Sequence, residues 1–251
     1  MPGAGIDIGS RTVKLVLVED GEVSSARVQE NSFDPVAVSR ELLAGVQHDR
    51  IIATGYGRHL FQAEFGGGII SEIKAFAAGA RALFPACRTL LDIGGQDTKA
   101  ISLDASGRVR KFEMNDRCAA GTGRFLEIMA SALGFSLDTF GEAALTSGRT
   151  VKVNNMCTVF AESEVISLVA RGMPREAVAR GIHEAVVRRS AAMLRRIRIE
   201  GDLVFVGGVA LNSCMRERLQ AETGREVRTP GNPQIVGALG CALLAENSGA
   251  G

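Results

Sequence analysis

Two cysteines lie in sequence contexts that favour a reactive or ligand-binding thiolate. Cys118 in "NDRCAAGTGRFLE" (115–127) and Cys157 in "NNMCTVFAESEVISLVA" (154–170) each precede a helical pattern. We expect both to lie at helix starts, where free N–H groups and the helix dipole stabilise a thiolate. Neither motif has the paired spacing of a zinc knuckle or a redox dithiol. Each cysteine therefore lacks ligand partners within its own motif.

Three glycine turns form a second set of chemical candidates. "DIGSRT" (7–12), "DIGGQDT" (92–98) and "VGGVALN" (206–212) each follow an apolar stretch. Glycine lets main-chain N–H groups turn toward phosphate oxygens. The first two turns also carry an aspartate and hydroxyl side chains, whose oxygens are ligands that Mg²⁺ prefers. Asp7 and Asp92 are the Mg²⁺ candidates, through water. Taken singly, each turn has the alternative interpretation of a tight connection between strands.

The glycine turns match neither of two common nucleotide motifs. A Walker A motif requires GxxxxGK[ST], and a dinucleotide fingerprint requires GxGxxG. The sequence contains neither pattern. P-loop and Rossmann folds are therefore disfavoured.

The elements that must position these residues repeat along the chain. Residues 4–18 are predicted as strand, glycine turn and strand, and residues 88–114 repeat the pattern with Asp92 aligned on Asp7. We expect a helix at about 35–46, although 31–50 and 136–150 are loop-like. Helical patterns fill roughly 120–199, with interruptions near Gly134, Gly148 and Gly172, and "NPQIVGALGCALLAE" (232–246) predicts a terminal helix of small residues.

Composition limits the classes of function. With 251 residues, 46% of them hydrophobic, the chain can bury a core, and its net charge of +1 argues against a nucleic-acid surface. No leader pattern or apolar run of about 18 residues is present, so we expect a cytoplasmic protein without a membrane partner. The basic segment 187–200 is either a solvated face or a docking surface for an acidic partner. Cys87, Cys214 and Cys241 are predicted as inert buried thiols.

The ordered motifs "GIDIGSRTVK", "LDIGGQDTK" and "FVGGVALN" resemble the actin, sugar-kinase and Hsp70 superfamily. The resemblance implies an α/β fold of two ribonuclease-H-like, actin-like ATPase lobes with ATP in the cleft between them. The first lobe would span 1–86 and be completed by the C-terminal helix 232–251. The second lobe, 87–231, would carry both motif cysteines.

Further motifs narrow the resemblance. Together with "ATGYGR" (53–58), the two cysteine motifs look like those of the ATPase activators of 2-hydroxyacyl-CoA dehydratases and the related ATPase subunits of benzoyl-CoA reductases. A small departure is Arg11, where a second small hydroxyl residue is common. The resemblance implies a homodimer with one [4Fe-4S] cluster ligated by Cys118 and Cys157 of each protomer, since such a cluster needs four thiolates.

The same resemblance implies a function. The dimer would use ATP to drive single electrons onto an acyl-CoA dehydratase or reductase, and would receive them from ferredoxin or flavodoxin. Asp7, Asp92 and Gln96 would be the catalytic residues, with Gln96 orienting the attacking water or only bonding across its turn. The residues expected to bind ATP are Gly9, Ser10, Arg11, Thr12, Lys14, Gly94, Gly95, Asp97, Thr98, Gly121, Gly123, Glu162, Gly207, Gly208, Val209 and Asn212.

Several assignments keep an alternative. Glu162 would reach the ribose, or it and Glu164 form an ordinary acidic first helical turn. Asn212 would contact adenosine or only cap the next helix. The nucleotide and cluster roles of Gly121 and Gly123 are not separated.

Two other functions fit the fold class. A small-molecule kinase would need a substrate pocket and a general-base aspartate, and no motif supports either. A non-catalytic scaffold would use nucleotide and zinc only as structural groups.

Overall fold

The computed structural model describes residues 2–155 and 157–248 and divides them into two compact units. Met1, Met156 of the second cysteine motif and 249–251 of the predicted terminal segment lie outside this description. Unit 1 comprises Met1–Leu90, Ile101–Lys111 and Pro230–Gly251, and unit 2 comprises Leu91–Ala100 and Phe112–Thr229. Three of the four boundaries, at 90/91, 100/101 and 111/112, fall within strands. The predicted lobe limits of 1–86 with 232–251, and 87–231, stay a prediction.

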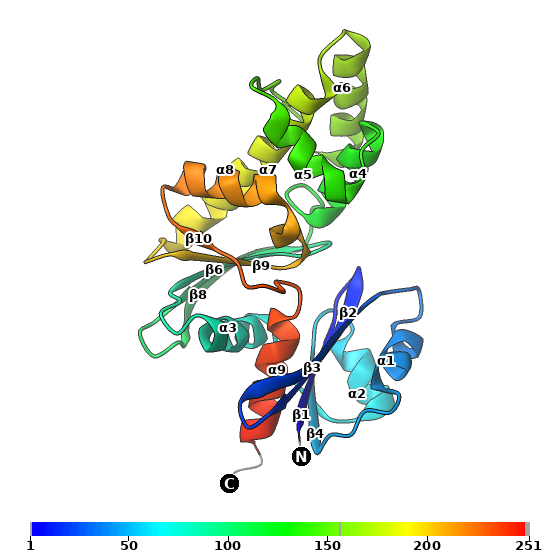
Figure 1. Ribbon diagram of the computed structural model, residues 1–251, viewed down its shortest axis with the longest axis vertical. Coiled ribbons are helices and arrows are strands. Elements are labelled where there is room, and N and C mark those ends of the chain that lie inside the picture. The colour runs from blue at the N-terminus through cyan, green and yellow to red at the C-terminus, as the bar shows by residue number, and fades with distance from the viewer. Residues whose placement is uncertain (1, 156, 249–251) are drawn as a thin grey trace. The chain divides into compact units, whose positions relative to one another are not determined.

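The first sheet has the strand order β3-β2-β1-β4-β5 (Figure 1). β1 pairs antiparallel with β2 and parallel with β4, so β1 lies in the middle and is buried along its whole length. The register places Asp7 of β1 directly opposite Lys14 of β2. The strands are β1 (Gly3–Ile8), β2 (Thr12–Glu19), β3 (Glu22–Glu30), β4 (Arg50–Thr54) and β5 (Gly68–Ile69).

The second sheet repeats this order with later strands. Its order is β10-β9-β6-β7-β8, so β6 takes the place of β1 and β7 that of β2. The duplication predicted from the Asp7 and Asp92 segments is thus present in both sheets. The strands are β6 (Thr89–Ile93), β7 (Thr98–Leu103), β8 (Val109–Asn115), β9 (Leu203–Val206) and β10 (Val227–Arg228).

Three of the four helices of unit 1, α1, α2 and α9, pack on the first sheet. Val38, Leu42 and Phe61 of α1 and α2 join the core made by β1, β2 and β4, while Ala238 and Ala242 of α9 pack against other residues of β2. The helices are α1 (Pro35–Leu43), α2 (Arg58–Phe65), α3 (Glu72–Leu83) and α9 (Val236–Asn247). The predicted helix near 35–46 is confirmed, whereas the loop-like interpretation of 31–50 misses it.

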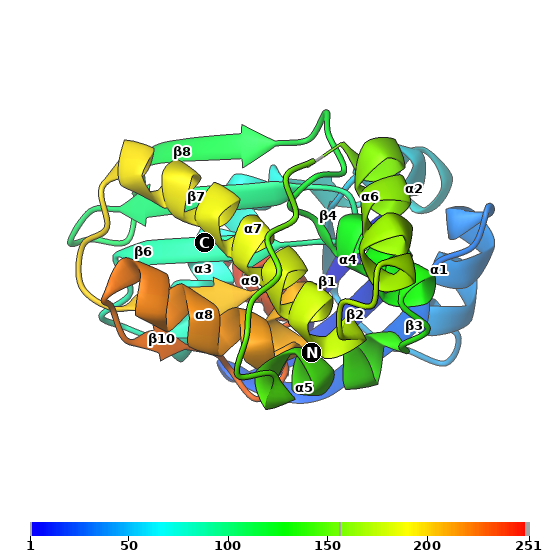
Figure 2. The same cartoon turned by 90° about the horizontal axis from the view of Figure 1, so that it is seen from above.

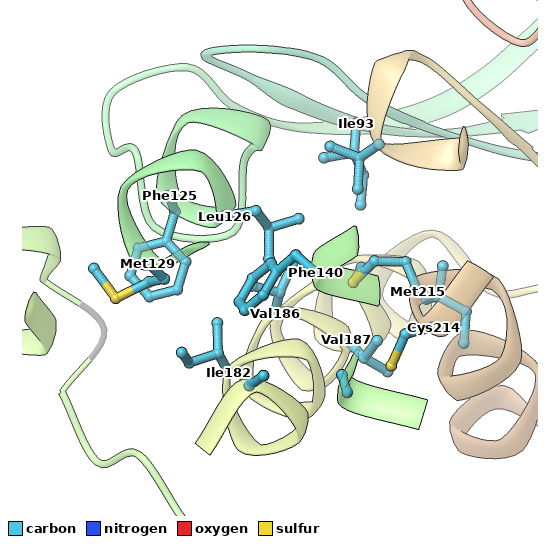
Figure 3. Close-up of a cluster of buried hydrophobic side chains, with 14 of the residues drawn as sticks. Ile93, Phe125, Leu126, Met129, Phe140, Ile182, Val186, Val187, Cys214 and Met215 are labelled. Atoms are coloured by element: carbon cyan, nitrogen blue, oxygen red, sulfur yellow. The ribbon is translucent and has the colours of Figure 1, made fainter. Parts of the chain in front are cut away.

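Unit 2 contains a larger helical core. α7 and α8 lie over the second sheet (Figure 2), and Phe125, Phe140 and Val186 pack with Ile93 in one hydrophobic cluster (Figure 3). The elements are α4 (Gly123–Ala132), α5 (Leu137–Thr146), α6 (Thr158–Ala170), α7 (Arg175–Ile197), the 3₁₀ helix η1 (Gly208–Leu211) and α8 (Ser213–Thr223).

The loop-like interpretation of 136–150 is wrong over most of its length, whereas the helical pattern predicted over roughly 120–199 includes the helix found there. α5 forms there because the Ser136 side chain accepts a hydrogen bond from the Thr139 N–H and so caps the helix. The helix then buries Phe140 and Ala144 in the core of unit 2. Within 2–155 and 157–248, no helix has the length and apolar character needed to cross a membrane.

Small residues allow α3 and α9 to touch through their backbones. A Cβ on Gly240 of α9 would overlap the carbonyl oxygen of Ala75, and one on Gly79 of α3 would overlap the carbonyl oxygen of Val236. These contacting atoms belong to the main chain, so no rotamer change can relieve them. The small-residue pattern of the terminal segment therefore reflects a close helix contact.

We predict that Gly240→Ala lowers the free energy of unfolding by about 2 kcal/mol or more, because overpacking against fixed backbone outweighs the helix propensity gained by alanine. Urea denaturation measures this change. Gly231→Ala is the matched control, since a Cβ there meets nothing within 4 Å. Equal stability of the two variants would contradict the close contact.

Candidate nucleotide and cysteine sites

The first glycine turn is anchored by a buried ion pair. Asp7 is 4% exposed, and its Oδ2 lies 3.2 Å from Nζ of Lys14. The Gly9 N–H donates to the Thr12 carbonyl at 3.1 Å, which closes the turn. Burial of a carboxylate is costly unless it is paired, so the contact with Lys14 offsets part of the cost of burying Asp7. Ser10 is half-buried beside the exposed Arg11.

The second glycine turn has the same construction. Oδ2 of Asp92 lies 3.2 Å from Nζ of Lys99, and the Gly94 N–H donates to the Asp97 carbonyl at 3.0 Å. Here the lysine also binds Oδ2 of Asp97 at 2.6 Å. Asp97 thus belongs to a buried ion cluster, while Gln96 at the tip is exposed.

Lys99 is a site residue that the sequence interpretation missed. Its side chain is 2% exposed and lies between two carboxylates, so it belongs to the second turn as Lys14 belongs to the first. The signal was available, because both lysines stand seven residues after the duplicated aspartate.

A glycine at the end of a neighbouring strand packs directly against each aspartate side chain. Gly55 follows β4 with φ +89°, and Gly207 follows β9 with φ +86°. A Cβ at these positions would overlap Oδ1 of Asp7 and Oδ1 of Asp92, respectively. Positive φ and the close approach both require glycine. "ATGYGR" therefore plays the same structural part in the first unit as "VGGVALN" in the second.

The third glycine turn leads into a capped helix. Oδ1 of Asn212 accepts the Met215 N–H at 3.0 Å, and its Nδ2 lies 3.0 Å from Nε2 of His183. The helix-cap interpretation of Asn212 is confirmed, and its contact with ATP stays a prediction. Gly208 is exposed, while Val209 is buried.

His183 is a buried part of this cap. Its Nδ1 lies 2.7 Å from the Ala179 carbonyl, which makes Nδ1 the donor and leaves Nε2 to accept from Asn212. Burial lowers the pKa of His183 to about 4, against the weaker effect of that carbonyl bond. The imidazole is therefore neutral near pH 7.

The Cys118 segment is a turn rather than a helix start. Nδ2 of Asn115 donates to the carbonyls of Cys118 at 2.9 Å and Ala120 at 3.2 Å. α4 begins only at Gly123, with Thr122 as its N-cap residue. The predicted helix-start position is thus wrong for Cys118, because side-chain bonds from Asn115 hold the intervening residues in a turn. The Cys118 side chain is exposed.

Hydrogen bonds join this cysteine turn to the second glycine turn. The Gly123 and Arg124 N–H groups donate to the carbonyls of Gly94 at 2.9 Å and Gly95 at 2.8 Å. Oγ1 of Thr98 donates to the Gly121 carbonyl at 2.9 Å. The backbone groups of Gly121 and Gly123 therefore bond directly to the glycine turn. The Thr98 hydroxyl proton is likewise committed to the protein.

Cys157 does lie at a helix start. It is the N-cap residue of α6, with an exposed side chain. Glu164 on that helix accepts hydrogen bonds of 2.7–3.0 Å from the backbone and side-chain amides of Asn154 and Asn155. Burial raises the pKa of Glu164, but these bonds outweigh it and bring the pKa below its ordinary value. The carboxylate thus fixes the segment that leads to Cys157.

The alternative interpretation of Glu162 and Glu164 as a first helical turn is wrong. No acidic residue lies in the first turn of α6. Glu164 binds the preceding segment, and Glu162 is exposed. The ribose contact of Glu162 stays a prediction.

The remaining cysteines are chemically different. Cys87, Cys214 and Cys241 are at most 4% exposed. Burial raises the pKa of Cys87 and Cys214 to about 11 and that of Cys241 well above its ordinary value. Their prediction as inert buried thiols agrees with this burial. Across 2–155 and 157–248, no three His, Cys, Asp or Glu side chains converge on a metal position.

The chain is similar in sequence and in structure to known dehydratase activators. The chain is 41% identical over 250 residues to the activator of lactoyl-CoA dehydratase of Anaerotignum propionicum, with 96% of each chain covered. It is also similar to the activator of the 2-hydroxyisocaproyl-CoA dehydratase of Clostridium difficile, solved with bound ADPNP, at TM-score 0.92 and 36% identity over 100% of this chain and 96% of that chain.

A second solved structure covers the whole length of both proteins. The (R)-2-hydroxyglutaryl-CoA dehydratase component A of Acidaminococcus fermentans matches with TM-score 0.93 and 36% identity over 100% of each chain. The BadF/BadG/BcrA/BcrD ATPase family matches residues 4–245. These matches agree with the duplicated α/β sheets and with the motif resemblance. The chain therefore belongs to the BadF/BadG/BcrA/BcrD ATPase family.

Proposed function

We propose that this protein is an ATP-driven one-electron donor that activates an acyl-CoA dehydratase or reductase. The observation that carries the proposal is the set of hydrogen bonds between the Gly94–Thr98 turn and the segment following Cys118. The turn that we propose to bind phosphate and the segment that carries an exposed thiol are thereby joined by hydrogen bonds. The names of the similar dehydratase activators support the same role.

ATP would bind through the glycine turns. Backbone N–H groups near Gly9 and Gly94 would take phosphate oxygens, with Ser10, Thr12, Gly95 and Gln96 contributing from the same turns. Gly207 and Gly208 would pack against adenosine, next to Val209. Lys14 and Lys99 offset the negative charges of Asp7 and Asp92 beside these turns, which would reduce the repulsion that a polyphosphate meets there.

Asp7 and Asp92 suit a hydrated Mg²⁺ ion. Each aspartate already has a lysine nitrogen at 3.2 Å, so a metal bound directly to the same oxygen would face a nearby like charge. Mg²⁺ usually retains several waters and binds through few carboxylates. Each aspartate would therefore hold the ion through water, and Gln96 would orient the attacking water.

The two exposed cysteines fit a [4Fe-4S] cluster shared by two copies of the chain. Such a cluster takes four thiolates, and one chain offers two exposed thiols, Cys118 and Cys157, while its buried thiols have raised pKa values. Cys157 is the N-cap residue of α6, where the positive end of the helix dipole would favour an anionic cluster. When bound, the cluster would accept and release single electrons.

Coupling between ATP hydrolysis and the Cys118 turn would proceed through hydrogen bonds within the chain. A change in phosphate contacts at Gly94 and Gly95 alters carbonyl groups that hold the start of α4, so the Cys118 turn would respond to hydrolysis. Any such response requires that ATP and ADP stabilise different conformations. The partner enzyme would dock on the homodimer, and ferredoxin or flavodoxin would supply electrons.

The phosphate assignment predicts a loss of ATP hydrolysis in Asp7→Asn and Asp92→Asn. We expect at least a hundredfold lower turnover, because metal-assisted charge stabilisation of about 3 kcal/mol corresponds to two orders of magnitude in rate. Phosphate release measures turnover. Iron content should stay at the wild-type level, since the thiols are different residues. Turnover near wild type in both variants would refute the assignment.

The cluster assignment predicts about four irons per two chains in protein purified without oxygen. Cys118→Ser and Cys157→Ser should each lose most of the iron, since symmetry removes two ligands at once, and should retain ATP binding. Iron analysis with a zinc determination measures this and also tests the scaffold alternative. Cys214→Ala is the control and should retain iron. Four irons per single chain, or full retention in Cys118→Ser, would exclude a shared cluster.

A further inference from the structure

A basic groove lies between α7 and the segment before α6. Its volume is about 440 Å³, and its lining residues are Lys152, Val153, Asn154, Ala185, Arg188 and Arg189. The 150–154 segment runs alongside α7 (Figure 2), and the Val151 N–H donates a 3.0 Å hydrogen bond to the Ala177 carbonyl of that helix. Val153 and Ala185 are buried, while Lys152 and Arg188 are exposed.

The basic side chains of the groove have weaker acidic partners than other arginines of α7. Arg195 lies 3.4 Å from Glu222, and Arg196 lies 3.4 Å from Glu113. Arg188 reaches Glu184 only at 3.9 Å, and Glu184 lies closer to Arg180, at 3.3 Å. Among the residues that the structure describes, no acidic side chain lines the groove. Its positive charge is therefore only weakly offset by the protein itself.

The groove borders both cysteine segments. Arg189 lies against Gly121, where a Cβ would come within 2.8 Å of its Cδ atom, and Gly121 stands three residues after Cys118. Asn154 stands three residues before Cys157 and is bound to Glu164 of α6. A partner seated in this groove would thus touch the segments that carry both exposed thiols.

We propose that this groove is the docking site for an acidic electron-carrier protein. The inference rests on the proposed function, and it assigns the electron-entry side to Lys152, Arg188 and Arg189. Positive charge that the protein offsets only weakly attracts an acidic surface and accelerates its encounter. One electron passes from the reduced carrier to the cluster, with no bond made or broken. The solvated-face alternative for segment 187–200 then applies to Arg195 and Arg196, which have acidic neighbours.

The test compares Arg188→Glu with Arg195→Glu, which make the same charge change seven residues apart on one helix. The probe is a purified ferredoxin of strongly negative net charge, and calorimetry measures its Kd for the anaerobic dimer at about 50 mM and about 500 mM salt, where screening lengths differ severalfold. We expect Arg188→Glu to raise Kd about tenfold at low salt and to approach wild type at high salt. Arg195→Glu should bind like wild type.

Lys152→Glu provides a second variant from the other wall and should weaken binding in the same way. Iron content and ATP turnover should be unchanged in all three variants, which separates docking from folding. Wild-type affinity in Arg188→Glu and Lys152→Glu, equal weakening in Arg195→Glu, or absence of binding by wild type would overturn the inference. A wild-type protein without iron would instead refute the proposed function, and this inference with it.

Discussion

The hydrogen bonds that join the Gly94–Thr98 turn to residues 121–124 are the constraint on which the rest of the site depends. The first N–H groups of a helix have no partner within the helix, and a buried N–H left unpaired costs free energy. α4 satisfies two of them with the carbonyls of Gly94 and Gly95. The start of α4 and the glycine turn are therefore not free to move independently, and the Cys118 turn is attached to both.

The two duplicated halves share one arrangement of aspartate, lysine and glycine, and they differ in the group that binds the carbonyl of the glycine turn. Each has an aspartate paired with a lysine seven residues later and supported by a glycine of positive φ. In the first half, however, the Gly9 carbonyl accepts the side-chain amide of Asn31 at 2.6 Å, whereas the equivalent Gly94 carbonyl accepts the first N–H of α4. We infer that both halves bind the nucleotide and that only the second half transmits nucleotide-dependent changes to a cysteine.

Much of this site could be predicted from local pattern. Apolar strands ending in Asp and Gly identified both ion-paired turns, and the placement of Cys157 before an apolar helix was correct. The errors arose where distant residues decide the structure. The bonds from Asn115 hold Cys118 away from the helix start, and the partner of the Thr98 hydroxyl lies 23 residues away. Lys99 was missed although the repeat pointed to it. The loop-like interpretation of 136–150, which competed with the helical pattern over 120–199, failed because a serine cap and tertiary burial stabilise α5.

The central claim is that the glycine turn and the Cys118 turn respond together to nucleotide, and Thr98→Val tests it most directly. Valine keeps the shape of threonine and removes the hydroxyl that donates to Gly121, a bond worth about 1 kcal/mol net, or roughly fivefold in an equilibrium. The measurement is the midpoint potential of the proposed cluster with ADP and with a non-hydrolysable ATP analogue. We expect the two potentials to differ in wild type and Thr98→Ser, and the difference to shrink clearly in Thr98→Val at unchanged iron content. An undiminished difference in Thr98→Val, or none in wild type, would contradict the account.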